Sequence, residues 1–328
     1  MPELPEVETV RRRLLTCLPG LLLRDVVVND WTVSAQTELE LNAYLAQRRV
    51  TGVRRRGKYL LLDLGQPQER AAPASDGPAG DPRPAGFAHD GPSVAVVHLR
   101  MTGQLVFRPE PGERPARFVW EFEPAATLYF QDVRRFGRLW ALAPEDETAF
   151  FEARGMGPEP FGPDFTPAYL RGALTGRRAP LKSFLVDQRR IAGVGNIYAD
   201  EALFRARLHP LRAAGSVGPR EALRLHAAIL ETLQAGIDHE GSSIESFIDP
   251  AGQRGSFQEI LNVYQRTGEP CRVCGTQVER VVVGGRGTHY CPRCQPRRGG
   301  MAPGSRRRRG AVTPPRTAKP ADWEGPDW

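Results

Sequence analysis

Long apolar runs are missing from this sequence, since no stretch approaches the ~18 consecutive apolar residues that a membrane-spanning helix needs. The first residues also lack the basic and then apolar pattern of a secretory signal, because Glu3, Glu6 and Glu8 stand there. These two absences argue against an integral membrane protein and against secretion. They favour a soluble protein of the cytoplasm that has no membrane partner.

Cysteine and lysine are both scarce. Four of the five cysteines fall between residues 271 and 294, which excludes a disulfide framework spread over the chain and favours a metal site. Only Lys58, Lys182 and Lys319 are lysine among 45 cationic residues, so arginine serves wherever any cation suffices. Lysine is a compact point charge whose pKa can be lowered, so a lysine retained here is a candidate for a specific role.

The chain has 328 residues, of which 40% are hydrophobic, so it is long enough for about two domains and too apolar to be wholly disordered. Its formal charge of +7 is unevenly placed. Residues 296–328 hold eight cations against three acids and show no apolar face, which predicts a disordered basic tail. Such a tail either attracts polyanions without reading sequence or is simply solvated.

Short apolar runs separated by turns dominate the first part of the chain, after a helix predicted over residues 3–15. We therefore expect a β-sandwich or barrel-like domain over residues 1–150. A stretch rich in proline and glycine at 66–92 interrupts it, and we interpret this stretch as a flexible surface insertion. The predicted strands cover residues 25–29, 59–64, 94–99, 103–107, 118–122, 127–130 and 139–142.

The pattern becomes helical from about Pro167 to Ile237, which predicts a second domain over residues 151–265. A cysteine module over residues 266–295 follows it. The predicted fold class is therefore α+β with several domains.

The cysteine module reads Cys271-Arg-Val-Cys274, sixteen residues, and then Cys291-Pro-Arg-Cys294. Two such pairs supply four thiolates for a tetrahedral zinc ion, and a hairpin between them can bring the pairs together. Because the protein provides all four ligands, the pattern predicts one structural Zn²⁺ and no catalytic metal. Nearby His289 is not needed as a ligand, and we expect it to be exposed on the hairpin.

Three further patterns each allow two interpretations from the residues alone. Gly193-Val-Gly195 before a predicted helix suits a phosphate, but a tight turn between helices needs the same glycines. Arg286 at a glycine-rich turn suits nucleic acid, or is solvated. Removal of Met1 would leave a secondary amine at Pro2 that can form a Schiff base, whereas the alternative is a proline that starts a helix.

Six blocks in a fixed order decide between these alternatives. Together they resemble the bacterial formamidopyrimidine-DNA glycosylases, bifunctional base excision repair enzymes that remove 8-oxoguanine and ring-opened purines. The resemblance runs from residue 1 to about residue 295, apart from the insertion, and does not cover the tail. The blocks are Met1-Pro-Glu-Leu-Pro-Glu-Val-Glu-Thr9, Arg56-Gly-Lys-Tyr59, His98-Leu-Arg-Met-Thr-Gly103, Asp132-Val-Arg-Arg-Phe-Gly137, Gly193-Val-Gly-Asn-Ile-Tyr198 and Gly268-Glu-Pro-Cys-Arg-Val-Cys-Gly275.

The resemblance implies an N-terminal β-sandwich flanked by helices, a helix–two-turn–helix domain and a C-terminal zinc-ribbon finger. It implies double-stranded DNA with oxidised bases or abasic sites as the partner, held in the cleft between the two halves. It also implies a monomer that works in the bacterial cytoplasm, associated with the nucleoid.

The resemblance further assigns catalytic roles. Pro2 would attack the sugar C1′, displace the damaged base and form the Schiff base from which β,δ-elimination cuts the strand. Glu3 would donate a proton to the sugar ring oxygen or the leaving group, with Glu6 supporting the proton network. Lys58 would lie near the lesion and its phosphate, and Arg286 would act in the same centre.

The remaining assigned residues would hold the DNA. Asn196 and Arg286 match the residues that grip the phosphates beside the flipped nucleotide, and Lys182 is assigned to DNA binding with them. Met101, Arg135 and Phe136 match the three residues that fill the space left by an extruded base.

Two departures from the family pattern matter. The sequence has Gly255-Ser-Phe257 where a tyrosine often precedes that phenylalanine, which leaves the lesion preference open, and the 66–92 insertion has no counterpart. An endonuclease VIII-like glycosylase for oxidised pyrimidines is the nearest alternative, and a non-catalytic DNA-binding protein is a more distant one. The complete set of Met101, Arg135 and Phe136 argues against the first, and the presence of Pro2 and Glu3 argues against the second.

Overall fold

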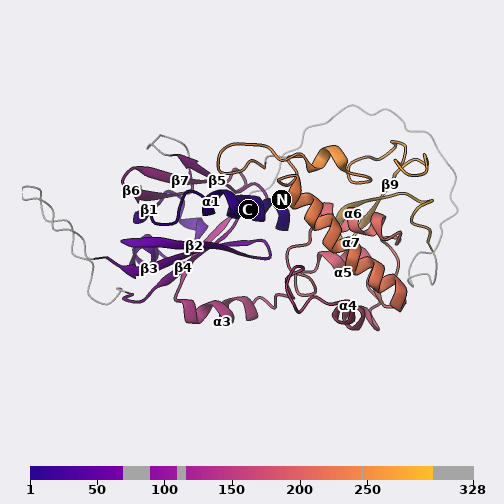
Figure 1. The fold of residues 1–328 in the computed structure, drawn as a ribbon, viewed down its shortest axis with the longest axis horizontal. Coiled ribbons are helices and arrows are strands. Elements are labelled where there is room, and N and C mark those ends of the chain that lie inside the picture. Colours follow the sequence, from indigo (N-terminus) through magenta and orange to yellow (C-terminus); the bar gives the residue numbers. More distant parts are fainter. Residues whose placement is uncertain (69–88, 109–115, 245–246, 298–328) are drawn as a thin grey trace, which may run out of the picture.

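A computed structural model describes residues 1–68, 89–108, 116–244 and 247–297. The 66–92 insertion and the 296–328 tail lie largely outside these ranges, and the predicted domain limits stay predictions. Figure 1 shows a domain of strands beside a domain of helices, with the N-terminus where the two meet. No helix in the described ranges is both long enough and apolar enough to cross a bilayer.

The first domain holds one antiparallel sheet of eight strands in the order β5-β7-β6-β1-β2-β3-β4-β8. Each predicted strand is present within a few residues of its predicted limits. The strands are β1 (Leu22–Val28), β2 (Arg48–Arg56), β3 (Tyr59–Pro67), β4 (Ser93–His98), β5 (Gln104–Arg108), β6 (Phe118–Glu123), β7 (Ala126–Gln131) and β8 (Arg138–Leu142).

The continuous sheet folds into a sandwich at the contact between β1 and β2. That contact has only two register pairs, Leu22 with Arg49 and Leu23 with Arg48, so the two halves of the sheet can turn over one another. Strands β5, β6, β7 and β1 form one layer, and β2, β3, β4 and β8 form the other (Figure 1). Both layers contribute to one apolar core, for example Trp120 from β6 and Leu62 from β3. The predicted sandwich is confirmed.

Helix α1 (Leu4–Leu15) joins the two domains. Its apolar residues recur at helical spacing, but they enter two different cores. Leu4 packs in the core of the helical domain, whereas Val7, Val10 and Leu14 pack in the core of the sandwich. The residues before Leu4 are therefore placed at the boundary between the domains. Helices α2 (Glu38–Leu45) and α3 (Glu147–Glu152) complete the first domain, with the short 3-10 turns η1 (Trp31–Val33) and η2 (Pro144–Asp146).

The helical domain is built around α7 (Pro219–Asp238), whose long apolar face packs on its neighbours. Around it lie α4 (Pro167–Leu174), α5 (Leu181–Val186) and α6 (Asn196–Arg205), with the 3-10 turns η3 (Ala214–Ser216) and η4 (Phe257–Ile260). The chain then forms the hairpin of β9 (Glu279–Val283) and β10 (Arg286–Tyr290), which packs against α6. The helical and cysteine-containing parts thus follow the predicted order.

Candidate active site

Glu3 lies at the N-terminal end of α6, although almost two hundred residues separate them in the sequence. Its carboxylate accepts hydrogen bonds from the backbone N–H of Ile197 at 3.0 Å and of Tyr198 at 3.5 Å. Only 2% of Glu3 is exposed. The N-terminus of a helix favours a negative charge, so α6 fixes this carboxylate at the domain boundary.

Glu6 lies one helical turn further along α1 and connects three segments of the chain. It accepts hydrogen bonds from the Tyr198 hydroxyl at 2.7 Å, the Ser242 backbone N–H at 2.7 Å and the Glu3 backbone N–H at 2.8 Å. Burial and the neighbouring Glu3 carboxylate raise the pKa of Glu6, and the three donors oppose this rise. The predicted supporting carboxylate is therefore hydrogen-bonded to the backbone of Glu3, the predicted proton donor.

A cavity of about 170 Å³ opens beside these two carboxylates. It gathers residues from both domains and from the β9–β10 hairpin. Five of the predicted site residues line it besides Glu6. Its lining includes Met1, Pro2, Glu3, Glu6, Met101, Asn196, Ser242, Ile244, Phe247, Tyr264 and Arg286. This is the concave, mixed polar and apolar kind of site that binds small groups in proteins.

Lys58 forms the tight turn between β2 and β3 together with Gly57 and is almost completely buried, with 5% exposed. Burial lowers the pKa of this lysine, the carboxylates of Glu3 and Glu6 oppose the change, and the Arg286 guanidinium adds to it. Burial destabilises the charged form of an ammonium group, and a bound anion would offset that cost. The position of Lys58 therefore suits the phosphate contact that its sequence motif implies.

Lys182 has a different place from the one predicted. Its side chain is fully buried, and Nζ donates to Oδ1 of Asp200 at 2.5 Å and to the Asn196 carbonyl at 2.6 Å. A completely covered ammonium cannot contact DNA directly in this structure. It supports Asn196 from beneath, because it binds the backbone of that residue.

His289 also differs from its predicted exposure, since only 7% of it is accessible. Its backbone N–H donates to Oδ2 of Asp200 at 2.9 Å, and Nδ1 lies 3.2 Å from the same oxygen. Asp200 thus holds β10 of the hairpin against α6. A further hydrogen bond from Asn196 Nδ2 to the Gly287 carbonyl, 3.1 Å long, brings Asn196 and Arg286 to the same cavity.

The three residues predicted to fill the space of an extruded base lie on two neighbouring loops. Met101 lines the cavity, and Phe136 projects with 48% of its surface exposed. The Arg135 side chain is 75% exposed, and its backbone has a φ of 57°. An exposed phenylalanine beside an exposed arginine is unusual on a surface with no partner, and this arrangement suits insertion into a stack of bases.

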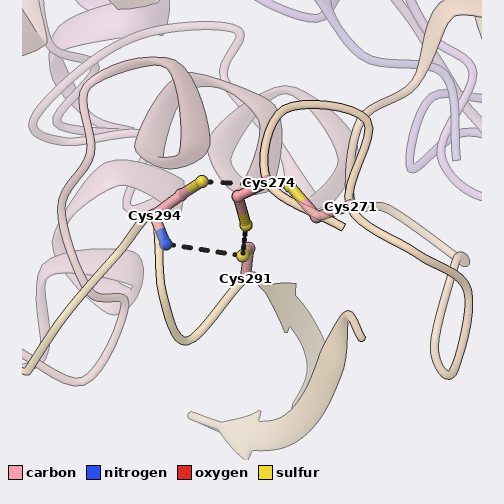
Figure 2. Close-up of side chains that lie close together, drawn as sticks. All are labelled: Cys271, Cys274, Cys291 and Cys294. Atoms are coloured by element: carbon pink, nitrogen blue, oxygen red, sulfur yellow. Dashed lines mark hydrogen bonds between the residues drawn. The ribbon is translucent and has the colours of Figure 1, made fainter. Parts of the chain in front are cut away.

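The four cysteines of the module converge on one centre (Figure 2). Their sulfur atoms all lie within 4.8 Å of one another, with Cys271 and Cys294 at 3.9 Å and Cys274 and Cys291 at 3.4 Å. Tetrahedral zinc with Zn–S bonds of ~2.3 Å requires sulfur atoms at about this separation. The donor set and its geometry fit one structural Zn²⁺, as predicted.

Comparison with known proteins matches three families in the order found in the structure. Residues 1–139 match the formamidopyrimidine-DNA glycosylase N-terminal domain, residues 156–248 the H2TH domain of the same enzymes, and residues 268–297 the zinc finger found in FPG and IleRS. A curated formamidopyrimidine-DNA glycosylase of Pelotomaculum thermopropionicum is 41% identical over 298 residues, which are 90% of this chain and 99% of the relative. The chain belongs to the formamidopyrimidine-DNA glycosylase family.

Solved structures of formamidopyrimidine-DNA glycosylases share this fold. The MutM (FPG) protein of Thermus thermophilus is 42% identical with a TM-score of 0.73, covering 90% of this chain and 98% of its own. The Lactococcus lactis enzyme, in complex with DNA containing N7-benzyl-Fapy-dG, is 32% identical with a TM-score of 0.77, covering 90% and 100%. These matches confirm the predicted family and its three-part architecture.

Three supporting residues of this site were not found from the sequence. Tyr198 and Asp200 lie on the first turns of α6, close to the Gly193-Val-Gly195 element that precedes this helix. Glu159 precedes α4 and accepts hydrogen bonds from the side chains of Arg55 and Arg56 beside Lys58. A partly buried acid among arginines leaves no distinct local pattern, so only the folded structure reveals Glu159 as a support for the Lys58 turn.

Proposed function

We propose that this family member is a bifunctional DNA glycosylase and abasic-site lyase that excises oxidised purines from double-stranded DNA in base excision repair. The observation that carries the proposal is the cavity itself. It brings Pro2 and Glu3 together with Asn196 and Arg286, which come from distant parts of the chain. A nucleophile, a carboxylic acid and two phosphate-binding groups are the parts that this chemistry needs.

In the proposed reaction the mature chain begins at Pro2, so that its amine is free. The amine nitrogen attacks C1′ of the damaged nucleotide, the bond to the base breaks, and the departing base takes up a proton. Glu3 supplies the proton needed at the sugar ring oxygen or the leaving group, and Glu6 exchanges protons with the same network. The amine then loses its proton, the C1′–O4′ bond of the sugar breaks as the ring oxygen takes up a proton, and the resulting iminium Schiff base permits β- and δ-elimination of the two flanking phosphates.

The remaining site residues have binding roles in this proposal. Lys58, Asn196 and Arg286 hold the phosphates beside the extruded nucleotide, whereas Met101, Arg135 and Phe136 occupy the space that it leaves. Lys182 acts only through Asn196, to which it is bonded. The protein would act as a monomer in the bacterial cytoplasm, at the nucleoid, where its DNA substrate lies.

The test is borohydride trapping on a duplex that carries 8-oxoguanine opposite cytosine, with mass mapping of the cross-linked peptide. A cross-link on an N-terminal Pro2 supports the proposal. Adding one residue before Pro2 should remove the cross-link and strand cleavage while DNA binding persists, because the amine becomes an amide. Undiminished cleavage by the extended protein would exclude Pro2 as the nucleophile.

A second duplex with an oxidised pyrimidine belongs in the same experiment. The Lactococcus lactis enzyme has been solved with DNA that contains an oxidised pyrimidine and, in another structure, an abasic site. Trapping only on the oxidised-pyrimidine duplex would favour an endonuclease VIII-like specificity. Binding without trapping on either duplex would favour a non-catalytic protein.

A further inference from the structure

Residues 247–257, which we call the strap, connect the two domains a second time. Phe247 at one end packs in the core of the sandwich, and Phe257 at the other end packs in the core of the helical domain. Phe247 also lines the active-site cavity, next to Ser242 and Ile244. The strap is therefore continuous with one wall of the site.

One arginine of α1 binds the first part of the strap and the segment that follows α7. Arg13 Nε donates to Oδ2 of Asp249 at 2.8 Å, and its Nη2 donates to Oε1 of Glu240 at 3.0 Å. The Asp249 side chain is 2% exposed, whereas 43% of the Arg13 side chain is accessible. This contact joins the last turn of α1 to the strap across 236 positions of sequence.

The strap keeps its own turn independently of Arg13. The other oxygen of Asp249, Oδ1, accepts from the backbone N–H of Ala251 at 2.9 Å and of Gln253 at 2.8 Å. The Pro250 carbonyl accepts from the backbone N–H of Phe107, at 3.0 Å, on edge strand β5. Loss of the Arg13 side chain would therefore free the strap from α1, and Asp249 would keep its two backbone hydrogen bonds.

We propose that Arg13 and Asp249 are positioning residues for base excision, which hold the strap and its adjoining cavity wall in place before DNA arrives. The inference rests on the proposed function, because it assigns the wall to the extruded base. Ordering a segment in advance lowers the entropy cost of binding what touches it. An abasic site has no base to touch the wall, so strand cleavage at such a site should not need the contact.

The experiment compares two reactions of the full-length protein under single-turnover conditions. One is excision of 8-oxoguanine, and the other is strand cleavage at a preformed abasic site. Arg13→Gln should lower the excision rate about fivefold, as expected for loss of a half-buried ion pair, and leave abasic-site cleavage unchanged. Arg13→Lys should regain part of the excision rate, because it keeps the charge.

Arg12→Gln is the matched control. Arg12 lies in the same last turn of α1 but pairs with Glu8, at 3.0 Å, and forms no hydrogen bond or ion pair with the strap in the described part of the chain. It should leave both reactions unchanged. An equal loss of both reactions in Arg13→Gln, or no loss of excision, would overturn the inference.

The wild-type protein separates this inference from the proposed function. If it neither excises the base nor cleaves the abasic site, the proposed function fails, and the inference falls with it. If it performs both reactions and Arg13→Gln keeps the wild-type ratio between them, only the inference fails.

Discussion

At the scale of single residues, the position of Glu3 depends on a neighbour that has no side chain. A Cβ atom on Gly195 would lie 2.2 Å from the Glu3 carboxyl carbon and within 2.5 Å of both oxygens. These distances are far shorter than any real contact, so the Glu3 carboxylate would have to leave the α6 N-terminus. Gly195 is required here for close approach and not for a special backbone angle, since its φ is −129°.

Gly195→Ala should therefore reduce base excision about a hundredfold, because a displacement of about 1 Å can cost that much in a reacting site. The measurement is single-turnover excision of 8-oxoguanine, together with thermal unfolding. Gly172→Ala is the control, since Gly172 lies in α4 with nothing within 4 Å of the added carbon. Normal excision by Gly195→Ala would show that the carboxylate is not needed where the structure places it.

Lys58 gives a pH dependence whose sign follows from its burial. Its pKa is lowered, so the ammonium loses its proton and its charge at a pH below the ordinary range of lysine. Affinity for a duplex with an abasic-site analogue should therefore fall as the pH rises, at values below the ordinary titration range of lysine. Fluorescence anisotropy at constant ionic strength measures this. In Lys58→Met the affinity should be lower and flat over that range, and a parallel fall in both proteins would assign the titration to another group.

Residue types were easier to predict than residue surroundings. The scarcity of lysine marked Lys58 and Lys182 as unusual, but the sequence could not tell that both side chains are buried, Lys58 with 5% exposed and Lys182 fully covered. Lys182 and His289 are buried because both bind Asp200, a partner on another element. Pairings of that kind depend on how elements pack, and local sequence patterns do not contain them.

At the scale of elements, strand β2 shows why one strand was not predicted. Its sequence, Arg48-Arg-Val-Thr-Gly-Val-Arg-Arg-Arg56, has only two large apolar residues, and shifts in register on either side of Val50 break the alternation. Arg48 is buried nonetheless, with its guanidinium bonded to the carbonyl of Gly65 at 3.1 Å. A hydropathy pattern does not distinguish a buried arginine from an exposed one, so the sequence did not predict β2.

The zinc hairpin is an element whose metal should matter for DNA binding. Asp200 and Asn196 hold one side of the hairpin against α6, but the cysteine ends have only a small apolar core, so the metal must fix them. Removing zinc, or Cys271→Ser, should weaken binding to an abasic-analogue duplex about tenfold, because Arg286 loses its fixed position.

Fluorescence anisotropy and a zinc assay on the same samples test this prediction. Cys17→Ser is the control, since Cys17 is half-buried just beyond α1, apart from the four cysteines that converge. It should keep both zinc and affinity. Unchanged affinity in zinc-free protein would mean that α6 alone positions the hairpin.

At the scale of the whole molecule, the site exists because two domains meet on one helix. Leu4 belongs to one core and Val7 to the other, so Pro2 and Glu3 must lie at the junction. The order of the motifs along the chain indicated which residues matter, and their resemblance to a family indicated how they meet. Within the strap, the sequence pattern marked only Gly255-Ser-Phe257, and the contact of Arg13 with Asp249 that ties the strap to the same junction is visible only in the folded chain.

Charge at the same scale predicts how the molecule approaches DNA. The chain carries a formal charge of +7, and the segment 298–328, outside the described residues, holds seven cations against three acids. Each phosphate contact changes the slope of log affinity against log salt by about 0.9. Deleting 298–328 should therefore flatten the slope for undamaged duplex DNA if the segment contacts phosphates, while excision at saturating DNA is preserved because the cavity is untouched.

Replacing Arg306–Arg309 by serine in the full-length chain keeps the length and removes four charges, and it should reproduce most of the change. An identical slope in all three proteins, measured by anisotropy titrations at several salt concentrations, would show that the segment contributes no contact.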